Sequence, residues 1–435
     1  MRGAHAFMRR IRSLAMSRIE VVVLIALIGG VGMALRRDQE AMLMPTRPHV
    51  RLDAHGRPWI VLNDGVELPT IYVGAAQARE ALERGSVRPT ALTSADFDED
   101  GVPDLVSGYA RPAGGLLTLH RGNGAFLWPN DVDAQARQAA GRLLHAPFWP
   151  EAPVVELPEP PDFLGAGDFD ADGHADVVTA ARGGRMLYVL RGDGRGGWHE
   201  LRTLELPGEV TALVVGELNQ ADGLEDIVVG ITGHEGPCVL VFESPEGAVR
   251  REPERIPLPD EATALALGSL DEDFKFDLAI AAGHHLMIVH GRERYWRSAD
   301  QPSALASQIR IDRQLLPVRL IALAIGDFLW DHEHRAEIAA LGEDGAVRVL
   351  ARRLISDVKL APSSAGTASW EEIAAWSDGD LSASAFSHPP AVMGRLVRAK
   401  VSSLPSDDLL VLVPGCRRWH LLANLIPIED SATDL

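Results

Sequence analysis

The chain is short of cysteine, tyrosine and positive charge, and each shortage argues against a class of protein. Its 2 cysteines, Cys238 and Cys416, are too few and too far apart for a disulfide framework or a zinc knuckle. We expect two buried thiols, with one long-range disulfide as the alternative. The 61 acidic and 42 basic residues leave a formal charge of −19, which argues against nucleic acid because phosphate binding needs a basic surface.

Familiar signatures of catalysis are also missing. The chain has no nucleophile elbow, no P-loop and no GxGxxG motif after a strand. His332-Glu333-His334 lacks the spacing of a known zinc-ligand set and is interpreted as a solvated loop. We expect a protein that is not an enzyme. A polysaccharide lyase or hydrolase is the alternative, because catalytic carboxylates can be distant in sequence, although 4 tyrosines are few for a sugar cleft.

The N-terminus has the features of an export signal. A segment with five arginines precedes an uncharged, mostly apolar run from Val21 to Leu35, and Gly32 and Ala34 fit a signal-peptidase site. The run is shorter than the roughly 20 residues of a membrane-spanning helix. We therefore expect export to the periplasm, the cell surface or the medium. An uncleaved membrane anchor is the alternative and would be the only membrane contact.

Long helical patterns are scarce, whereas short apolar runs between Gly, Pro and Asp clusters predict an all-β protein. One acidic pattern recurs before such runs. GDFDADGHADVV (Gly167–Val178) is matched by ADFDEDGVPDLVSGY (Ala95–Tyr109), GELNQADGLEDIVVGI (Gly216–Ile231), GSLDEDFKFDLAIAAG (Gly268–Gly283), loosely by GDFLWDHEHRAEIAALG (Gly326–Gly342) and faintly by VSSLPSDDLLVLVPG (Val401–Gly415). The first five copies lie 49 to 72 residues apart, close to the ~40–50 residues of a propeller blade.

Each repeat predicts a four-stranded unit. After the acidic loop come the strands DVVTAA, MLYVLRG and HELRTLELP, and the strand VTALVVG leads into the next loop. Helical insertions are expected at 75–84, at 131–148 and, from a capping box, at 369–376 within an excursion over 361–390 that is poor in strand signals. We divide the chain into a signal or anchor (1–35), a linker (36–57), a β-propeller (58–425) and a tail (426–435).

The acidic loops predict calcium sites. Aspartates at positions 1, 3 and 5, a glycine at 6 and an acid at 9 supply the hard oxygens that Ca²⁺ prefers, with a backbone carbonyl from position 7. The two full sites comprise Asp96, Asp98, Asp100, Asp104 and the Val102 carbonyl, and Asp168, Asp170, Asp172, Asp176 and the His174 carbonyl. Asp271, Asp273 and Asp277 form a possible third site, where Phe274 replaces the glycine. Solvated, Asp-rich turns without metal are the alternative.

ADFDEDGVPDLV, GAGDFDADGHADVV and GSLDEDFKFDLA, with turns such as RGNGAF and RGDGRGGW, resemble the FG-GAP and VCBS repeats of bacterial exported proteins and of the integrin α-subunit propeller. The resemblance covers roughly residues 92–345. It implies a β-propeller, often seven-bladed, with calcium loops on one rim and a binding role. We expect seven blades, or six, with strands from 58–68 completing a blade with C-terminal strands.

These features together predict an exported, calcium-stabilised β-propeller that binds an extracellular or envelope protein or a glycan. A membrane-anchored sensor ectodomain is a further alternative. Arg191-Gly192-Asp193 spells an integrin-binding triplet, but RGNG at the same place in the first repeat favours an ordinary blade turn.

Overall fold

The computed structural model describes residues 50–52, 58–61, 68–141, 143–219, 222–271, 273, 275–292, 309–329, 335–353, 369–376, 395–402, 405–412 and 418–422. The chain divides into two compact units: unit 1 comprises Met1–Val50 and Ile60–Val210, and unit 2 comprises Arg51–Trp59 and Thr211–Leu435. No helix within the described ranges has the length and apolar character to cross a membrane. The predicted signal (1–35), the tail (426–435), Cys416 and the His-Glu-His triplet (332–334) lie outside these ranges.

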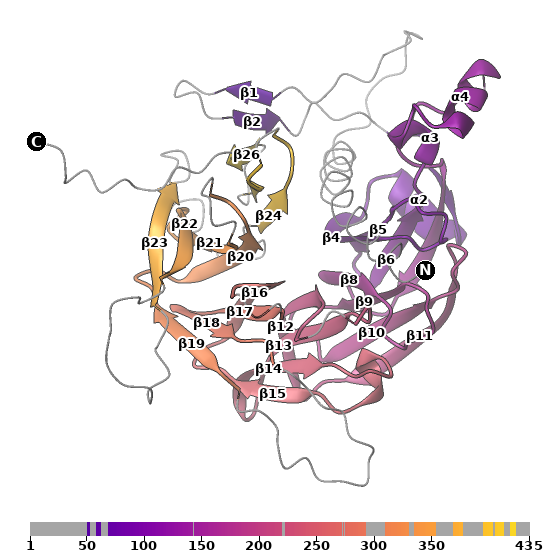
Figure 1. The fold of residues 1–435 in the computed structure, drawn as a ribbon. Helices are drawn as coiled ribbons and strands as arrows, with labels where there is room; N and C mark the ends of the chain where they lie inside the picture. The colour runs from indigo at the N-terminus through magenta and orange to yellow at the C-terminus, as the bar shows by residue number, and fades with distance from the viewer. Residues whose placement is uncertain are drawn as a thin grey trace, which may run out of the picture. The chain divides into compact units, whose positions relative to one another are not determined.

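Unit 1 contains two sheets of the same antiparallel design (Figure 1). Blade 1 has the order β3-β7-β6-β5-β4, in which only the β3–β7 pair is parallel, and blade 2 has the order β11-β10-β9-β8. The strands are β3 (Ile71–Val73), β4 (Arg88–Ala95), β5 (Asp104–Ala110), β6 (Gly115–His120), β7 (Glu151–Leu157), β8 (Phe163–Gly167), β9 (Asp176–Ala180), β10 (Met186–Gly192) and β11 (Trp198–Glu205). Helices α2 (Ala76–Glu83), α3 (Gly124–Leu127) and α4 (Val132–Ala139) are additions to blade 1.

Unit 2 contains four further sheets, apart from short pieces of β12, β1 and β2 that belong to unit 1. Blade 3 contains β12 (Gly208–Gly216), β13 (Asp226–Gly233), β14 (Gly236–Phe242) and β15 (Glu254–Pro257); blade 4 contains β16 (Ala262–Gly268), β17 (Asp277–Ala282), β18 (His285–Val289) and β19 (Ile311–Leu315). Blade 5 contains β20 (Leu320–Gly326), β21 (Glu337–Gly342), β22 (Val347–Arg353) and β23 (Ser369–Trp376). Blade 6 has the order β1-β2-β26-β25-β24, with β1 (Val50–Leu52), β2 (Pro58–Val61), β24 (Arg395–Ala399), β25 (Asp408–Leu412) and β26 (Arg418–Leu422).

Within each unit, neighbouring sheets share their apolar cores. In unit 1, Val106 and Leu117 of blade 1 lie in one buried cluster with Val177 and Leu190 of blade 2. Corresponding clusters in unit 2 join blades 3 and 4, blades 4 and 5, and blades 5 and 6. Stacked four-stranded antiparallel sheets are the blades of a β-propeller. The predicted all-β propeller class is therefore confirmed, with six blades, the smaller of the two expected numbers.

One detail of the predicted organisation is corrected. The strand VTALVVG is not the fourth strand of the preceding blade: it forms most of β12 and pairs within blade 3. Each acidic loop therefore connects the first two strands of a single blade. In addition, the N-terminal β2 lies beside the C-terminal β26 in blade 6, as was predicted for strands from 58–68.

The predicted helix at 369–376 is wrong, and the one at 131–148 is too long. Residues 369–376 form β23, whose buried Trp370 packs into the core between blades 4 and 5. Tertiary packing here overrides the local capping-box signal. Helix α4 ends at Ala139, before the positive φ of Gly141, whereas the predicted helix at 75–84 is present as α2. Cys238 is a buried free thiol, as expected.

Candidate metal centre

The six acidic loops are called loops 1 to 6 after their blades and span residues 96–104, 168–176, 217–226, 269–277, 327–337 and 400–408. Loops 1 and 2 have the same backbone conformation. Position 4 has positive φ in both, 56° at Glu99 and 60° at Ala171, as does position 6, 86° at Gly101 and 90° at Gly173. A glycine at position 6 is favoured there because only glycine adopts this conformation without strain.

The last acid of every loop is buried and holds the turn together. In loop 1, Oδ2 of Asp104 accepts a 2.9 Å hydrogen bond from the Phe97 N–H, and in loop 4, Oδ2 of Asp277 accepts one of 2.8 Å from the Leu270 N–H. The acids in the other loops, which accept equivalent bonds, are Asp176, Asp226, Glu337 and Asp408. These carboxylates have a structural role whether or not a metal binds, since buried backbone donors need acceptors.

A glycine at the end of the second hairpin strand completes this arrangement. The N–H groups of Gly122, Gly192 and Gly291 each donate a 2.8 Å bond to Oδ1 of the last acid in their loop. A Cβ atom at Gly192 would lie 2.1 Å from the Ala175 carbonyl oxygen, so a side chain does not fit. The residue before each glycine, Arg121, Arg191 or His290, faces the acidic loop.

Loops 1 and 2 each gather three carboxylates around one point. One oxygen from each of Asp96, Asp98 and Asp104 lies within 4.8 Å of the others, and the same holds for Asp168, Asp170 and Asp176. Oδ1 of Asp98 and Oδ1 of Asp170 are buried without a hydrogen-bond partner among the described residues. Buried oxygens of this kind need a cation or a donor, so these residues fit a hard metal ion such as Ca²⁺.

Burial and neighbouring negative charge raise the pKa values of carboxyl groups in both loops. Burial raises the pKa of Asp104 and of Asp176 to about 7, and the neighbouring loop carboxylates add to the shift. Burial also raises the pKa of Asp100, and Asp98 and Asp96 contribute. A bound divalent cation would reverse these shifts because it favours the ionised carboxylates.

An arginine from the second hairpin strand partly neutralises each loop. The Arg191 guanidinium contacts Asp170 and lies 2.9 Å from Oδ2 of Asp172, whereas Arg121 lies 3.8 Å from Oδ2 of Asp98. Arg191 therefore forms ion pairs with two acids of loop 2. Asp193, the third residue of the Arg-Gly-Asp triplet, accepts the N–H groups of Arg195 and Gly197 within its turn.

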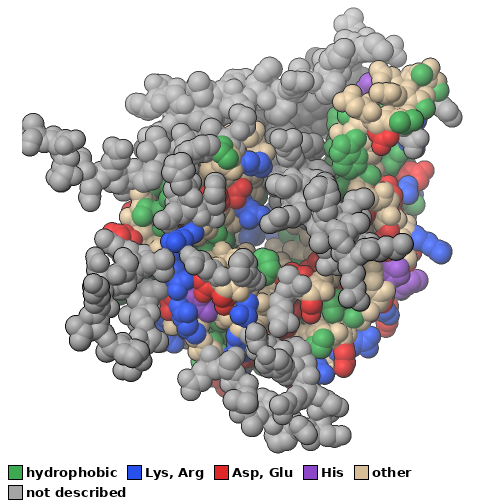
Figure 2. Space-filling model, in the orientation of Figure 1, with side chains coloured by type: hydrophobic (Ala, Val, Ile, Leu, Met, Phe, Trp, Pro, Cys, Tyr) green, Lys and Arg blue, Asp and Glu red, His purple; other side chains and the backbone are tan. Residues whose placement is uncertain are grey.

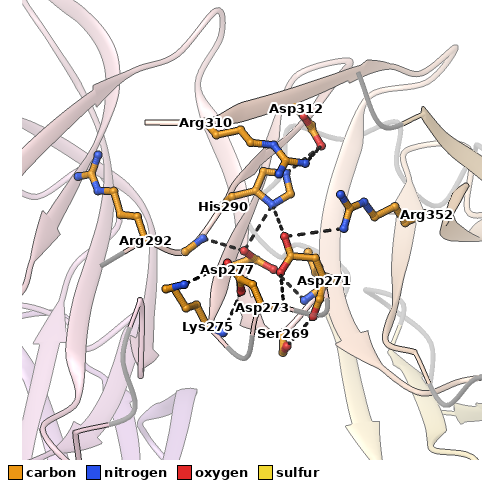
Figure 3. A network of polar contacts seen from close by, with 12 residues as sticks. Ser269, Asp271, Asp273, Lys275, Asp277, His290, Arg292, Arg310, Asp312 and Arg352 are labelled. Atoms are coloured by element: carbon orange, nitrogen blue, oxygen red, sulfur yellow. Dashed lines mark hydrogen bonds and ion pairs between the residues drawn. The ribbon is translucent and has the colours of Figure 1, made fainter. Parts of the chain in front are cut away.

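Loops 3 and 4 neutralise their acids differently. In loop 3, burial and then the neighbouring Glu243 raise the pKa of Asp226 to about 9, so this carboxyl group holds a proton at neutral pH. In loop 4, the buried His290 lies among Asp271, Asp277 and Asp312 (Figure 3). His290 and one oxygen of each of Asp271 and Asp277 also form a group with metal-binding spacing.

The structure thus brings together most predicted ligands but leaves some apart. Asp100 and Asp172 are outside the three-oxygen groups, and the N–H groups of Val102 and His174 bond to these two carboxylates. Asp273 of loop 4 is paired with Lys275 at 3.4 Å. Sequence reasoning missed the loop-facing role of Arg121, Arg191 and His290. The repeated Arg-Gly or His-Gly pair after the second strand was the available signal.

No protein-family model matches the chain, and no curated protein matches it. Among solved structures, a chain from BBS1N in complex with ARL6DN is 13% identical, with a TM-score of 0.43, over 82% of this chain and 80% of that one. A chain from an active polycomb repressive complex 2 in the basal state is 10% identical (TM-score 0.47; 75% and 65% covered), and the Dos1 propeller is 10% identical (0.36; 78% and 80%). The propeller assignment therefore rests on the sheets of this chain.

Proposed function

We propose that this protein is a non-enzymatic β-propeller that binds another protein through the segments added to blade 1. The observation that carries this proposal is the exposure of large apolar side chains there. Ile71 and Val73 on β3 are 60% and 50% exposed, and Trp128 and Val132, beside α3 and in α4, are 41% and 77% exposed. Large apolar side chains that are this exposed and lie on added segments favour an interaction site.

The β3 strand suggests how a partner is held. It lies at the end of its sheet, pairs with β7 and carries Ile71 and Val73 on one face. Beside it, Val73 and Pro153 line a hollow of about 140 Å³ together with Arg121 and Arg195. That volume is below the ~300–1,000 Å³ of small-molecule sites. An extended apolar segment with acidic flanks would complement this edge by strand addition.

Site-specific photo-crosslinking in cells tests this proposal. A benzoylphenylalanine probe at Val73 and, separately, at Val132 is expected to give the same protein adduct, because both positions lie on the added segments. Ile71→Asp should abolish the adduct from position 73. A probe at Leu315 of β19, which is 66% exposed, is the matched control. No adduct at Val73, or an equal adduct at Leu315, would contradict the proposal.

We also propose that loops 1 and 2 bind calcium as a structural ion. Asp96, Asp98 and Asp104 would hold one ion, and Asp168, Asp170 and Asp176 the other, supported by the partnerless oxygens of Asp98 and Asp170. The ion would offset the clustered negative charge beside the buried strands β5 and β9.

Export is proposed from the sequence of residues 1–35 alone. On the face shown in Figure 2, acidic and basic side chains are interspersed over the described parts.

A further inference from the structure

Loop 4 differs from loops 1 and 2 in what lies at its centre. His290 Nδ1 is 3.0 Å from Oδ2 of Asp271 and 3.6 Å from Oδ1 of Asp277, and its Nε2 is 2.8 Å from Oδ2 of Asp312. The side chains of His290, Asp271, Asp277 and Asp312 are all less than 10% exposed. Figure 3 shows the imidazole between these carboxylates.

His290 has carboxylate neighbours on both sides of its ring. Carboxylates lie at both ring nitrogens, and ionised carboxylates only accept hydrogen bonds. His290 can donate to both sides only when each ring nitrogen carries a hydrogen. Buried carboxylates require such a partner, because an uncompensated buried charge is strongly destabilising.

Two arginines complete the neutralisation. Arg352 of β22 lies 3.7 Å from Oδ2 of Asp271, and Arg310 lies 3.7 Å from Oδ2 of Asp312. The imidazole and two arginines therefore face the three carboxylates of Asp271, Asp277 and Asp312. Oδ1 of Asp271 accepts the Asp273 N–H, and both oxygens of Asp277 accept backbone N–H groups. In contrast to Asp98 and Asp170, neither aspartate keeps a buried oxygen without a partner.

Loop 4 also lacks parts of a calcium loop. Ser269 stands at position 1, so one carboxylate is missing, and its hydroxyl bonds to the Asp271 carbonyl. The residues of loop 4 therefore do not fit the calcium ion that the sequence pattern predicts.

We propose that His290, together with Arg352, takes the place of calcium in blade 4, so that this loop is held by cations of the chain itself. The contrast with loops 1 and 2 rests on their proposed calcium binding, whereas the role of His290 does not. A neutral residue at position 290 should then destabilise the protein. Arginine, which blades 1 and 2 carry at this position, should preserve more of the stability.

Thermal unfolding of the full chain at one fixed pH, in EGTA and in millimolar calcium, tests both parts. We expect calcium to leave the Tm of an Asp98→Asn/Asp170→Asn double variant unchanged, because loop 4 needs no ion. A calcium-induced increase in Tm that persists in the double variant and disappears when Asp271→Asn is added would overturn the proposal. If calcium does not affect wild type either, calcium binding by loops 1 and 2 fails, and the substitutions at position 290 still test His290.

In EGTA, His290→Gln is expected to lower the Tm by about 5 °C or more, and His290→Arg by clearly less. His284→Gln is the control, since His284 belongs to the same blade and its Nδ1 lies 3.3 Å from the Leu316 carbonyl oxygen. A His290→Gln variant as stable as wild type, or a His290→Arg variant no more stable than His290→Gln, would overturn the proposal.

Discussion

Loops 1 and 2 in unit 1 and loops 3 and 4 in unit 2 share an acidic pattern but differ in how the buried charge is offset. Asp98 and Asp170 keep oxygens without partners, which suits a metal ion. Asp226 in loop 3 retains a proton, with its pKa raised to about 9 chiefly by burial. Asp271 in loop 4 is paired with His290 and Arg352. We therefore propose that one backbone turn can be neutralised in three ways: by a metal ion, by a proton or by a side chain.

The comparison shows that the acids of the repeat have two separate roles. The last acid of each loop binds backbone N–H groups in all six blades and serves the turn. In loops 1, 2 and 4, earlier acids face the residue at or just after the end of the second hairpin strand, which is Arg121, Arg191 or His290. An acidic motif thus indicates the turn more reliably than it indicates a metal.

The largest expected effect comes from removing the last acid of a loop, and it should be the same in loops 1 and 4. Asp104→Ala in loop 1 and Asp277→Ala in loop 4 each leave two buried backbone N–H groups without an acceptor. Each should lower the free energy of unfolding by about 3 kcal/mol, measured by urea denaturation. Asp273→Ala, at the exposed side of loop 4, is the control and should cost less than about 1 kcal/mol. A small loss in only one of the two loops would refute the shared role.

Removal of calcium should have an intermediate effect on Tm, and this effect should depend on loops 1 and 2 but not on loop 4. At a calcium concentration 100 times the Kd, one ion stabilises the folded state by about 2.7 kcal/mol, so EGTA should lower the Tm of wild type. Asp98→Asn and Asp170→Asn should each remove part of this response, because each removes a ligand with a partnerless oxygen. Asp273→Asn in loop 4 is the matched control and should leave it intact. The same Tm in EGTA and in calcium would rule out these sites.

The smallest expected effect is a change in the pH dependence of stability that Asp226 of loop 3 causes. The folded state holds the Asp226 proton up to pH about 9, whereas an ordinary aspartate releases it near 3.8. The contribution of this group to stability is therefore complete below pH about 4 and is lost as the pH rises toward 9. Asp226→Asn, which stays neutral and can still accept the Leu218 N–H, should lose less stability between pH 6 and 9 in urea titrations. Equal pH dependence in both proteins would contradict the raised pKa.

Much of the fold could be predicted because its signals are local. Acids, glycines and apolar runs at fixed spacing indicated the loops and the strands that follow them, and the faint sixth copy contains the structural acid Asp408. Failures arose where distant packing decides. Residues 369–376 have a helix-start signal, yet they form a strand because Trp370 fills a core between two blades.

By itself, the sequence determined the turns of loops 1 and 2, since aspartate spacing and the positive φ at Gly101 and Gly173 are properties of neighbouring residues. Only the tertiary structure decided what offsets the charge. Arg191 and His290 come from the second strand of the hairpin, Asp312 from the outer strand and Arg352 from the next blade. Coulomb interactions depend on distance in space rather than along the chain. Similar motifs therefore surround an arginine in one blade and a buried histidine in another.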